Sequence, residues 1–123
     1  MRRLSFGFIA IVAVACLSFV GQTGAKGSKG STFTGEIMDS ACAKQGSHEM
    51  MEKMEGVNNA KDCTIKCVAE GSKYVLYNSA TKTIYALDDQ TKPGEFAGQK
   101  VTVTGIYDKA TKTIHVEKIE GAK

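Results

Sequence analysis

The sequence predicts a mainly β protein, a small five-stranded OB-like barrel with one Cys-bearing helix inserted between strands 1 and 2. Five segments alternate apolar and polar residues or are rich in β-branched and aromatic residues, which is typical of strands. A short turn or helical segment separates the third strand from the fourth, as in five-stranded OB-type barrels. The segment that carries these features, residues 32–120, has the length of one small domain.

The first 25 residues are typical of a secretory signal peptide. Two arginines precede a long apolar run, and Thr23 and Ala25 fit the −3 and −1 positions of a cleavage site. We therefore expect an exported protein, periplasmic or secreted, without stable membrane insertion after cleavage. A lipoprotein cut before Cys16 and an uncleaved anchor are the alternatives. Residues 26–31 lack apolar side chains and are predicted to form a flexible tether.

The first strand and the helix come next. Residues 32–38 alternate in the manner of a half-buried strand. Residues 39–57 show no clean period and predict an irregular loop with at most one helical turn. Asn58 or Asn59 is a suitable N-cap for a helix that ends near Glu70, and Gly71 fits the C′ position.

The remaining strands form two predicted hairpins. Residues 73–78 and 83–88 make the first, and residues 100–107 and 113–119 make the second. Between them, residues 89–99 contain Pro and Gly around a phenylalanine, which favours a short turn or single-turn helix that buries the ring.

Two details support the hairpins. The stretch from Tyr77 to Ile84 recurs from Tyr107 to Ile114, with Asn or Asp at its second position in each copy, so the same turn is predicted twice. Gly105 lies in the middle of a strand, where we expect the strand to bend.

Charge and composition exclude some partners. The net charge of +3 includes two arginines of the leader, so the rest of the chain carries 14 basic residues against 13 acidic ones. Nothing in this balance favours nucleic-acid binding, and the aromatic residues fall at core-like strand positions. We expect a monomer whose ligand or protein partner the sequence does not identify.

Cysteine and histidine residues after the first strand carry the main chemical signal. Cys63 and Cys67 are one helical turn apart and share a face of the predicted helix. A disulfide between them is unfavourable, because it requires Cβ atoms about 3.8 Å apart. One interpretation is therefore a structural disulfide from Cys42 to Cys63 or Cys67, which leaves the third thiol buried and inert.

A second interpretation is a metal site. The residues Cys42, His48, Cys63 and Cys67 form a Cys₃His set, which suits tetrahedral zinc or thiophilic copper(I). Methionines between His48 and Met54 would favour copper, unless they serve to pack against the barrel.

A third interpretation is a thiol-disulfide redox protein of the cell envelope. This role needs an exposed thiol of lowered pKa, which Lys66 and the helix N-terminus favour near Cys63, but a Cys-x-x-Cys motif is absent. The leading hypothesis is a non-enzymatic binding module whose Cys/His segment holds either a disulfide or a soft metal.

Asp39 is predicted to cap the turn after strand 1 or to support His48. His115 is predicted to be a solvated surface residue.

Three motifs carry a family resemblance. They are Gly35-Glu-Ile-Met-Asp-Ser-x-Cys42 followed by a histidine, Cys63-Thr-x-x-Cys-Val-x-x-Gly-Ser-Lys-Tyr-Val-Leu76, and Phe96-Ala-Gly-x-Lys-Val-Thr-Val-Thr-Gly105. Across residues 32–120 the chain resembles a family of small exported bacterial proteins of unknown function. The resemblance implies a signal peptide and an OB-like barrel, and it supplies no reaction, ligand or partner.

Overall fold

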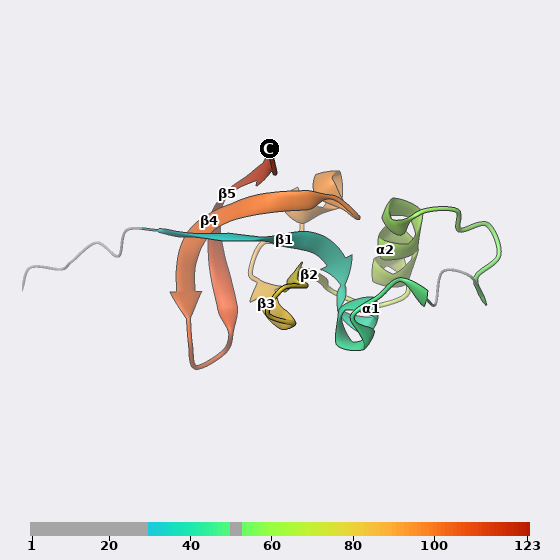
Figure 1. The fold of residues 1–123 in the computed structure, drawn as a ribbon, viewed down its shortest axis with the longest axis horizontal. Helices are drawn as coiled ribbons and strands as arrows, with labels where there is room; N and C mark the ends of the chain where they lie inside the picture. Colours follow the sequence, from blue (N-terminus) through green and yellow to red (C-terminus); the bar gives the residue numbers. More distant parts are fainter. Residues whose placement is uncertain (1–29, 50–52) are drawn as a thin grey trace, which may run out of the picture.

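A computed structural model describes residues 30–49 and 53–123 (Figure 1). The predicted leader and most of the predicted tether lie outside the described residues, although β1 already begins at the last tether residue. The strands are β1 (Ser31–Asp39), β2 (Tyr74–Asn78), β3 (Thr83–Leu87), β4 (Lys100–Asp108) and β5 (Thr113–Gly121). The helices are α1 (Ser40–Gln45), α2 (Ala60–Ala69) and the 3₁₀ helix η2 (Lys92–Phe96).

The five strands pair in a closed ring of hydrogen bonds. β1 pairs with β4 and β2, β2 with β3, β3 with β5, and β5 with β4, so every strand has two neighbours. The β3–β5 pair is parallel and the others are antiparallel, which makes the sheet mixed. The prediction of five strands in a mainly β domain, including both hairpins, is confirmed.

Where β1 meets β2, the sheet buries side chains on both faces. Alternate residues of a strand point to opposite faces, so Ile37 and Met38 enter different clusters. The ring core consists of Ile37, Leu76, Leu87, Val101, Val103 and Ile114. The helix-side core consists of Met38, Cys42, Ala43, Cys63, Cys67, Val75 and Tyr77. The three cysteines of the described chain therefore lie outside the ring, beneath the helices.

Between β1 and β2 the described residues form two α-helices, one more than the single inserted helix that the sequence predicts. α1 forms within the predicted loop because the Asp39 side chain accepts hydrogen bonds from two backbone N–H groups of its first turn. α2 follows the prediction: the Asn59 side chain caps its N-terminus, and Gly71 follows its end at a φ of +115°. α1 carries Cys42, whereas α2 carries Cys63 and Cys67.

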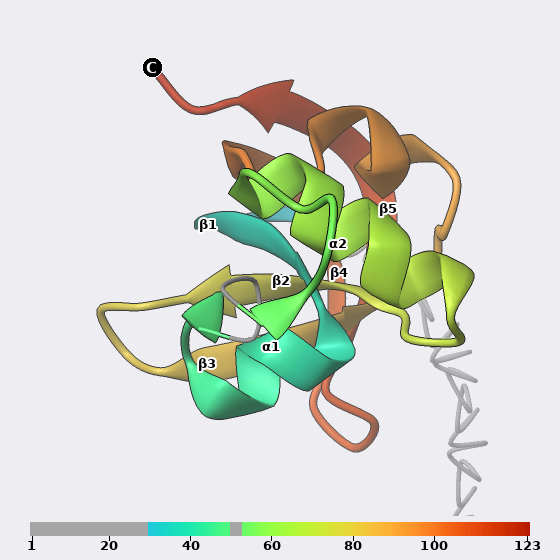
Figure 2. The same cartoon turned by 90° about the vertical axis from the view of Figure 1, so that its right-hand side faces the viewer.

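Both helices cover the outside of the sheet on the same side (Figure 2). α2 packs against β1, and α1 packs against β1 and β2. The backbone N–H of Ser40 donates to the carbonyl oxygen of Lys73, which ties the start of α1 to the start of β2. Within residues 30–49 and 53–123, no helix combines the length and apolarity needed to cross a bilayer.

The repeated sequence forms the same turn twice, as predicted. In the β2–β3 hairpin, Asn78 Oδ1 accepts hydrogen bonds from the two backbone N–H groups two and three residues later. In the β4–β5 hairpin, Asp108 Oδ1 does the same. Each turn ends on a lysine in the left-handed region, with φ of 53° at both Lys82 and Lys112. The side chain that opens the turn thus fixes its geometry in both copies.

The pairing of β4 with β5 shifts register between Thr104 and Gly105, at the predicted bend. A Cβ atom added to Gly105 would collide with the carbonyl oxygen of His115 and would lie 2.9 Å from Ile114 Cγ2. Since the first of these neighbours is backbone of the paired strand, it cannot move without disturbing the ladder. Only glycine fits this position.

We expect Gly105→Val to lower the free energy of unfolding by about 1–3 kcal/mol, because β5 must shift to admit the side chain. Urea denaturation measures the change. The matched control is Ile106→Val at the next position of β4, where the side chain is 38% exposed and the loss should be small. Equal midpoints for wild type and the Gly105 variant would contradict the close approach of the two strands.

Lys112→Gly should raise the free energy of unfolding by about 0.5–1 kcal/mol, since glycine adopts a positive φ without the cost that a Cβ imposes. Thermal or urea unfolding gives the difference. Lys109→Gly in the same turn is the control, because Lys109 has a negative φ and glycine there only adds entropy to the unfolded chain. A stabilised Lys109 variant, or an unstabilised Lys112 variant, would contradict this account of the turn.

Candidate metal centre

Asp39 stands where β1 ends and α1 begins, with its side chain fully buried. Its Oδ1 accepts hydrogen bonds from the backbone N–H of Ala41 at 3.0 Å and of Cys42 at 2.9 Å. Among the described residues, no hydrogen bond of good geometry reaches its Oδ2. The predicted capping role is therefore confirmed, and it leaves one carboxylate oxygen free inside the helix-side core.

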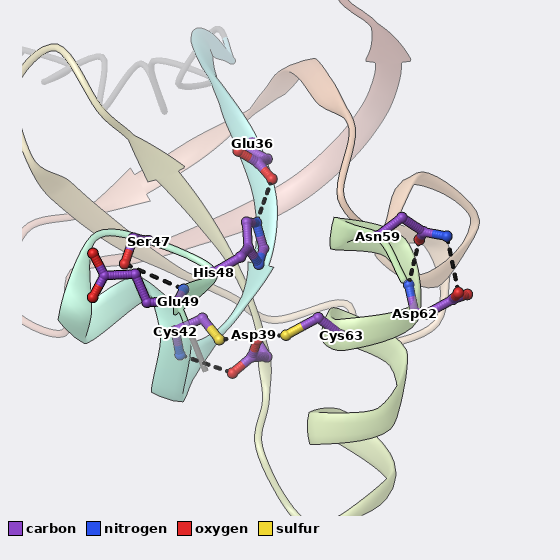
Figure 3. A network of polar contacts seen from close by, with 9 residues as sticks. All are labelled: Glu36, Asp39, Cys42, Ser47, His48, Glu49, Asn59, Asp62 and Cys63. Atoms are coloured by element: carbon purple, nitrogen blue, oxygen red, sulfur yellow. Dashed lines mark hydrogen bonds and ion pairs between the residues drawn. The ribbon is translucent and has the colours of Figure 1, made fainter. Parts of the chain in front are cut away.

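Three thiols surround this carboxylate. Cys42 comes from the first turn of α1, while Cys63 and Cys67 come from successive turns of α2. The Sγ atoms of Cys42 and Cys63 lie 3.7 Å apart (Figure 3). One potential ligand atom from each of Asp39, Cys42, Cys63 and Cys67 lies within 4.8 Å of the others, and all four residues are buried. We call this group the thiol-carboxylate cluster.

The structure does not show the predicted disulfide. All three cysteines of the described chain are free thiols. A disulfide bond is about 2.05 Å long, well below the 3.7 Å between Cys42 Sγ and Cys63 Sγ. In a tetrahedral site with metal–sulfur bonds of about 2.3 Å, two sulfur ligands lie about 3.8 Å apart. The separation of the two Sγ atoms is close to this value. The spacing of the sulfurs suits a shared ion.

Burial determines the protonation of the thiols. Burial, followed by the contacts with Asp39 and Cys63, raises the pKa of Cys42 far above its ordinary range. Burial, followed by the negative charge of Asp39, raises the pKa of Cys67 to about 11. Both thiols are protonated at neutral pH in the metal-free protein. A metal ion must therefore displace their protons when it binds.

His48 is not part of the thiol-carboxylate cluster, so the predicted Cys₃His set is not the group that the structure brings together. The Nε2 of His48 lies 2.7 Å from Glu36 Oε1, in a hydrogen bond on the outer side of β1. The fourth position beside the thiols belongs to Asp39. The sequence signal for this role was the Asp-x-x-Cys spacing, because an N-cap carboxylate lies next to the side chain in the first turn of its helix.

Two other predicted residues take ordinary roles. His115 is exposed on β5, as predicted, and its Nδ1 lies 3.1 Å from Asp88 Oδ2. Met54 packs against the helix-side core, which agrees with the packing interpretation of the methionines. Met50 and Met51 lie outside the described residues.

Comparison with known proteins adds one finding. A family described as "Protein of unknown function (DUF5818)" matches residues 68–122. No curated protein and no solved structure matches the chain. The matched stretch contains β2 to β5. All four members of the thiol-carboxylate cluster precede it.

We expect Cys67 to react slowly with iodoacetamide at neutral pH in the folded, chelator-treated protein. Raising the thiol pKa from 9.0 to about 11 lowers the thiolate fraction at neutral pH roughly 100-fold. Mass spectrometry of labelled peptides gives the rate at this residue. Asp39→Asn keeps the capping oxygen but removes the charge, so Cys67 should label faster in that variant. Labelling of native Cys67 at the rate of the unfolded chain would contradict its raised pKa.

Proposed function

We propose that the protein is a small exported module that binds one Zn²⁺ ion through Cys42, Cys63, Cys67 and Asp39. One observation carries the proposal: a buried carboxylate, whose Oδ2 has no hydrogen bond among the described residues, offers an oxygen within 4.8 Å of three buried thiol sulfurs. Burial of an unpaired carboxylate is costly, and a cation at the centre of the cluster would offset that cost. The two N–H bonds to Oδ1 would hold the ligating oxygen in place.

The donor set favours zinc among the metals. Sulfur donors exclude hard ions such as Mg²⁺ and Ca²⁺ and leave Zn²⁺ and Cu⁺ as the common candidates. When deprotonated, three thiolates and one carboxylate carry four negative charges. A divalent ion offsets more of this charge than a monovalent one does. Because all four residues are buried, no ligand position is open to a substrate, which is typical of structural zinc sites.

Thiol redox chemistry fits the same residues less well. A redox thiol must be accessible and at least partly ionised. Cys42 and Cys67 are buried, and their pKa values are raised. Lys66, which the sequence placed near Cys63 as a source of positive charge, donates its Nζ to the carbonyl oxygen of Glu55 at 3.2 Å.

The proposal extends to the fold and the location. The closed order β1-β2-β3-β5-β4, with η2 between β3 and β4, supports an OB-like barrel that carries the metal site in its first connection. The leader pattern of residues 1–25 supports export and cleavage after Ala25.

Titration of the chelator-treated protein with Zn²⁺, and with Co²⁺ as a spectroscopic probe, tests the site. We expect one ion per chain, with the thiolate-to-cobalt charge-transfer bands of a tetrahedral centre. Asp39→Asn should weaken Zn²⁺ binding at least about tenfold, and Cys42→Ser should weaken it further. His48→Ala should leave the affinity unchanged.

Thr64→Val is the matched control. Thr64 is fully buried on α2, and among the described residues its hydroxyl makes no hydrogen bond, so valine preserves the shape and leaves the affinity intact. Wild-type protein that binds neither Zn²⁺ nor Co²⁺ would overturn the proposed function. Equal affinity of wild type and Asp39→Asn would remove the carboxylate from the ligand set.

A further inference from the structure

A cavity of about 320 Å³ lies beside the metal centre on the outer face of β1. It is lined by residues from β1, from the loop after α1, from the end of β2 with the turn that follows, and from the start of β4, together with Ala122. Glu36, Met38, His48 and Tyr77 are among these residues. β1 and β2, which contribute Met38 and Tyr77 to the helix-side core, therefore also line the cavity.

The cavity and the thiols share a wall. Met38 and Tyr77 line the cavity, and both belong to the helix-side core together with Cys42, Cys63 and Cys67. Met38 is only 1% exposed, and it is one of the residues through which the cavity adjoins the helix-side core.

The imidazole of His48 has one ring nitrogen in a hydrogen bond and one without a partner among the described residues. Its Nε2 pairs with Glu36 at 2.7 Å, which favours the tautomer with the proton on Nε2 and leaves a lone pair on Nδ1. Nδ1 is buried and has no hydrogen-bond partner among the described residues. In the view of Figure 3, the ring is drawn between Glu36 and the sulfurs of Cys42 and Cys63, and the nitrogen that does not contact Glu36 points to the side of the sulfurs. Imidazoles that bind zinc commonly use this pairing with a carboxylate.

A fully buried metal centre needs a route by which the ion arrives. We propose that the cavity is the loading port for Zn²⁺ and that His48 Nδ1 is the transient ligand that transfers the ion to the thiol-carboxylate cluster. Glu36 attracts the hydrated cation and orients the ring. As the ion moves inward, the thiols release their protons to water and their sulfurs replace the nitrogen. This inference rests on the proposed function and concerns the rate of loading, whereas the proposed function concerns affinity.

Stopped-flow mixing of chelator-treated protein with Co²⁺, followed by the thiolate-to-cobalt absorption, tests the port. His48→Ala should slow loading at least about tenfold. Its equilibrium affinity should stay unchanged, so release to a competing chelator must slow by the same factor. Glu36→Gln should slow loading to a smaller extent, because it leaves the imidazole in place.

His115→Ala is the matched control, since it removes the exposed histidine that pairs with Asp88 on β5. It should load at the wild-type rate. Unchanged loading of the His48 variant would overturn the port, even where the proposed function holds. A His48 variant with lower equilibrium affinity would make His48 a resident ligand and would also overturn the transient role. Failure of wild type to bind the ion would instead reject the proposed function itself.

Discussion

The position of the Asp39 carboxylate is the constraint on which the rest of the structure depends. One side chain ends β1, caps α1 and presents an oxygen to three thiols. The cap explains why the chain turns into a helix directly after the strand, and the helix in turn places Cys42 opposite Cys63. Without an acceptor at this point the first connection would lose its starting geometry, and without the carboxylate it would lose the oxygen that lies among the three thiols.

The strands supply the rigid side of this arrangement. β1 and β2 bury Ile37 and Leu76 within the ring and Met38 and Val75 beneath the helices. The thiol-carboxylate cluster therefore lies between the sheet on one side and the two helices on the other. A site built against paired strands keeps its geometry better than one formed by loops alone.

The sequence was sufficient to predict those elements that depend on residues close together in the chain. The alternation of residues, the caps of α2 and the repeated turn depend on neighbours in the chain, and all three were predicted. So was the bend at Gly105, where the absence of a side chain is visible in the sequence. The same local reasoning underestimated α1, because a helix of one or two turns leaves too short a period to recognise.

The sequence predicted the thiol-carboxylate cluster only in part, because part of it depends on contacts between residues that are not neighbours in the chain. The sequence predicted that the three cysteines lie together, because Cys63 and Cys67 share one helix face and Cys42 had few other partners. His48 was chosen as their fourth partner on chemical type alone, yet its ring turns toward Glu36, a residue on the preceding strand. That contact depends on how the loop folds back over the sheet, which no local pattern encodes. The sequence predicted Asp39 as a helix cap. That its second carboxylate oxygen faces a buried space could not be predicted, because this depends on how the helices pack.

The separation of the ladder from the first connection has an evolutionary consequence. Every strand of the ring pairs with its two neighbours through residues of the five strands, whereas the three cysteines of the thiol-carboxylate cluster lie in α1 and α2, and Asp39 is the last residue of β1. The ladder's hydrogen bonds join backbone atoms, so exchanging a cysteine side chain of α1 or α2 removes none of them. Descendants of one scaffold can therefore gain, alter or lose the cluster while keeping the sheet, so selection can act on the two parts at different rates.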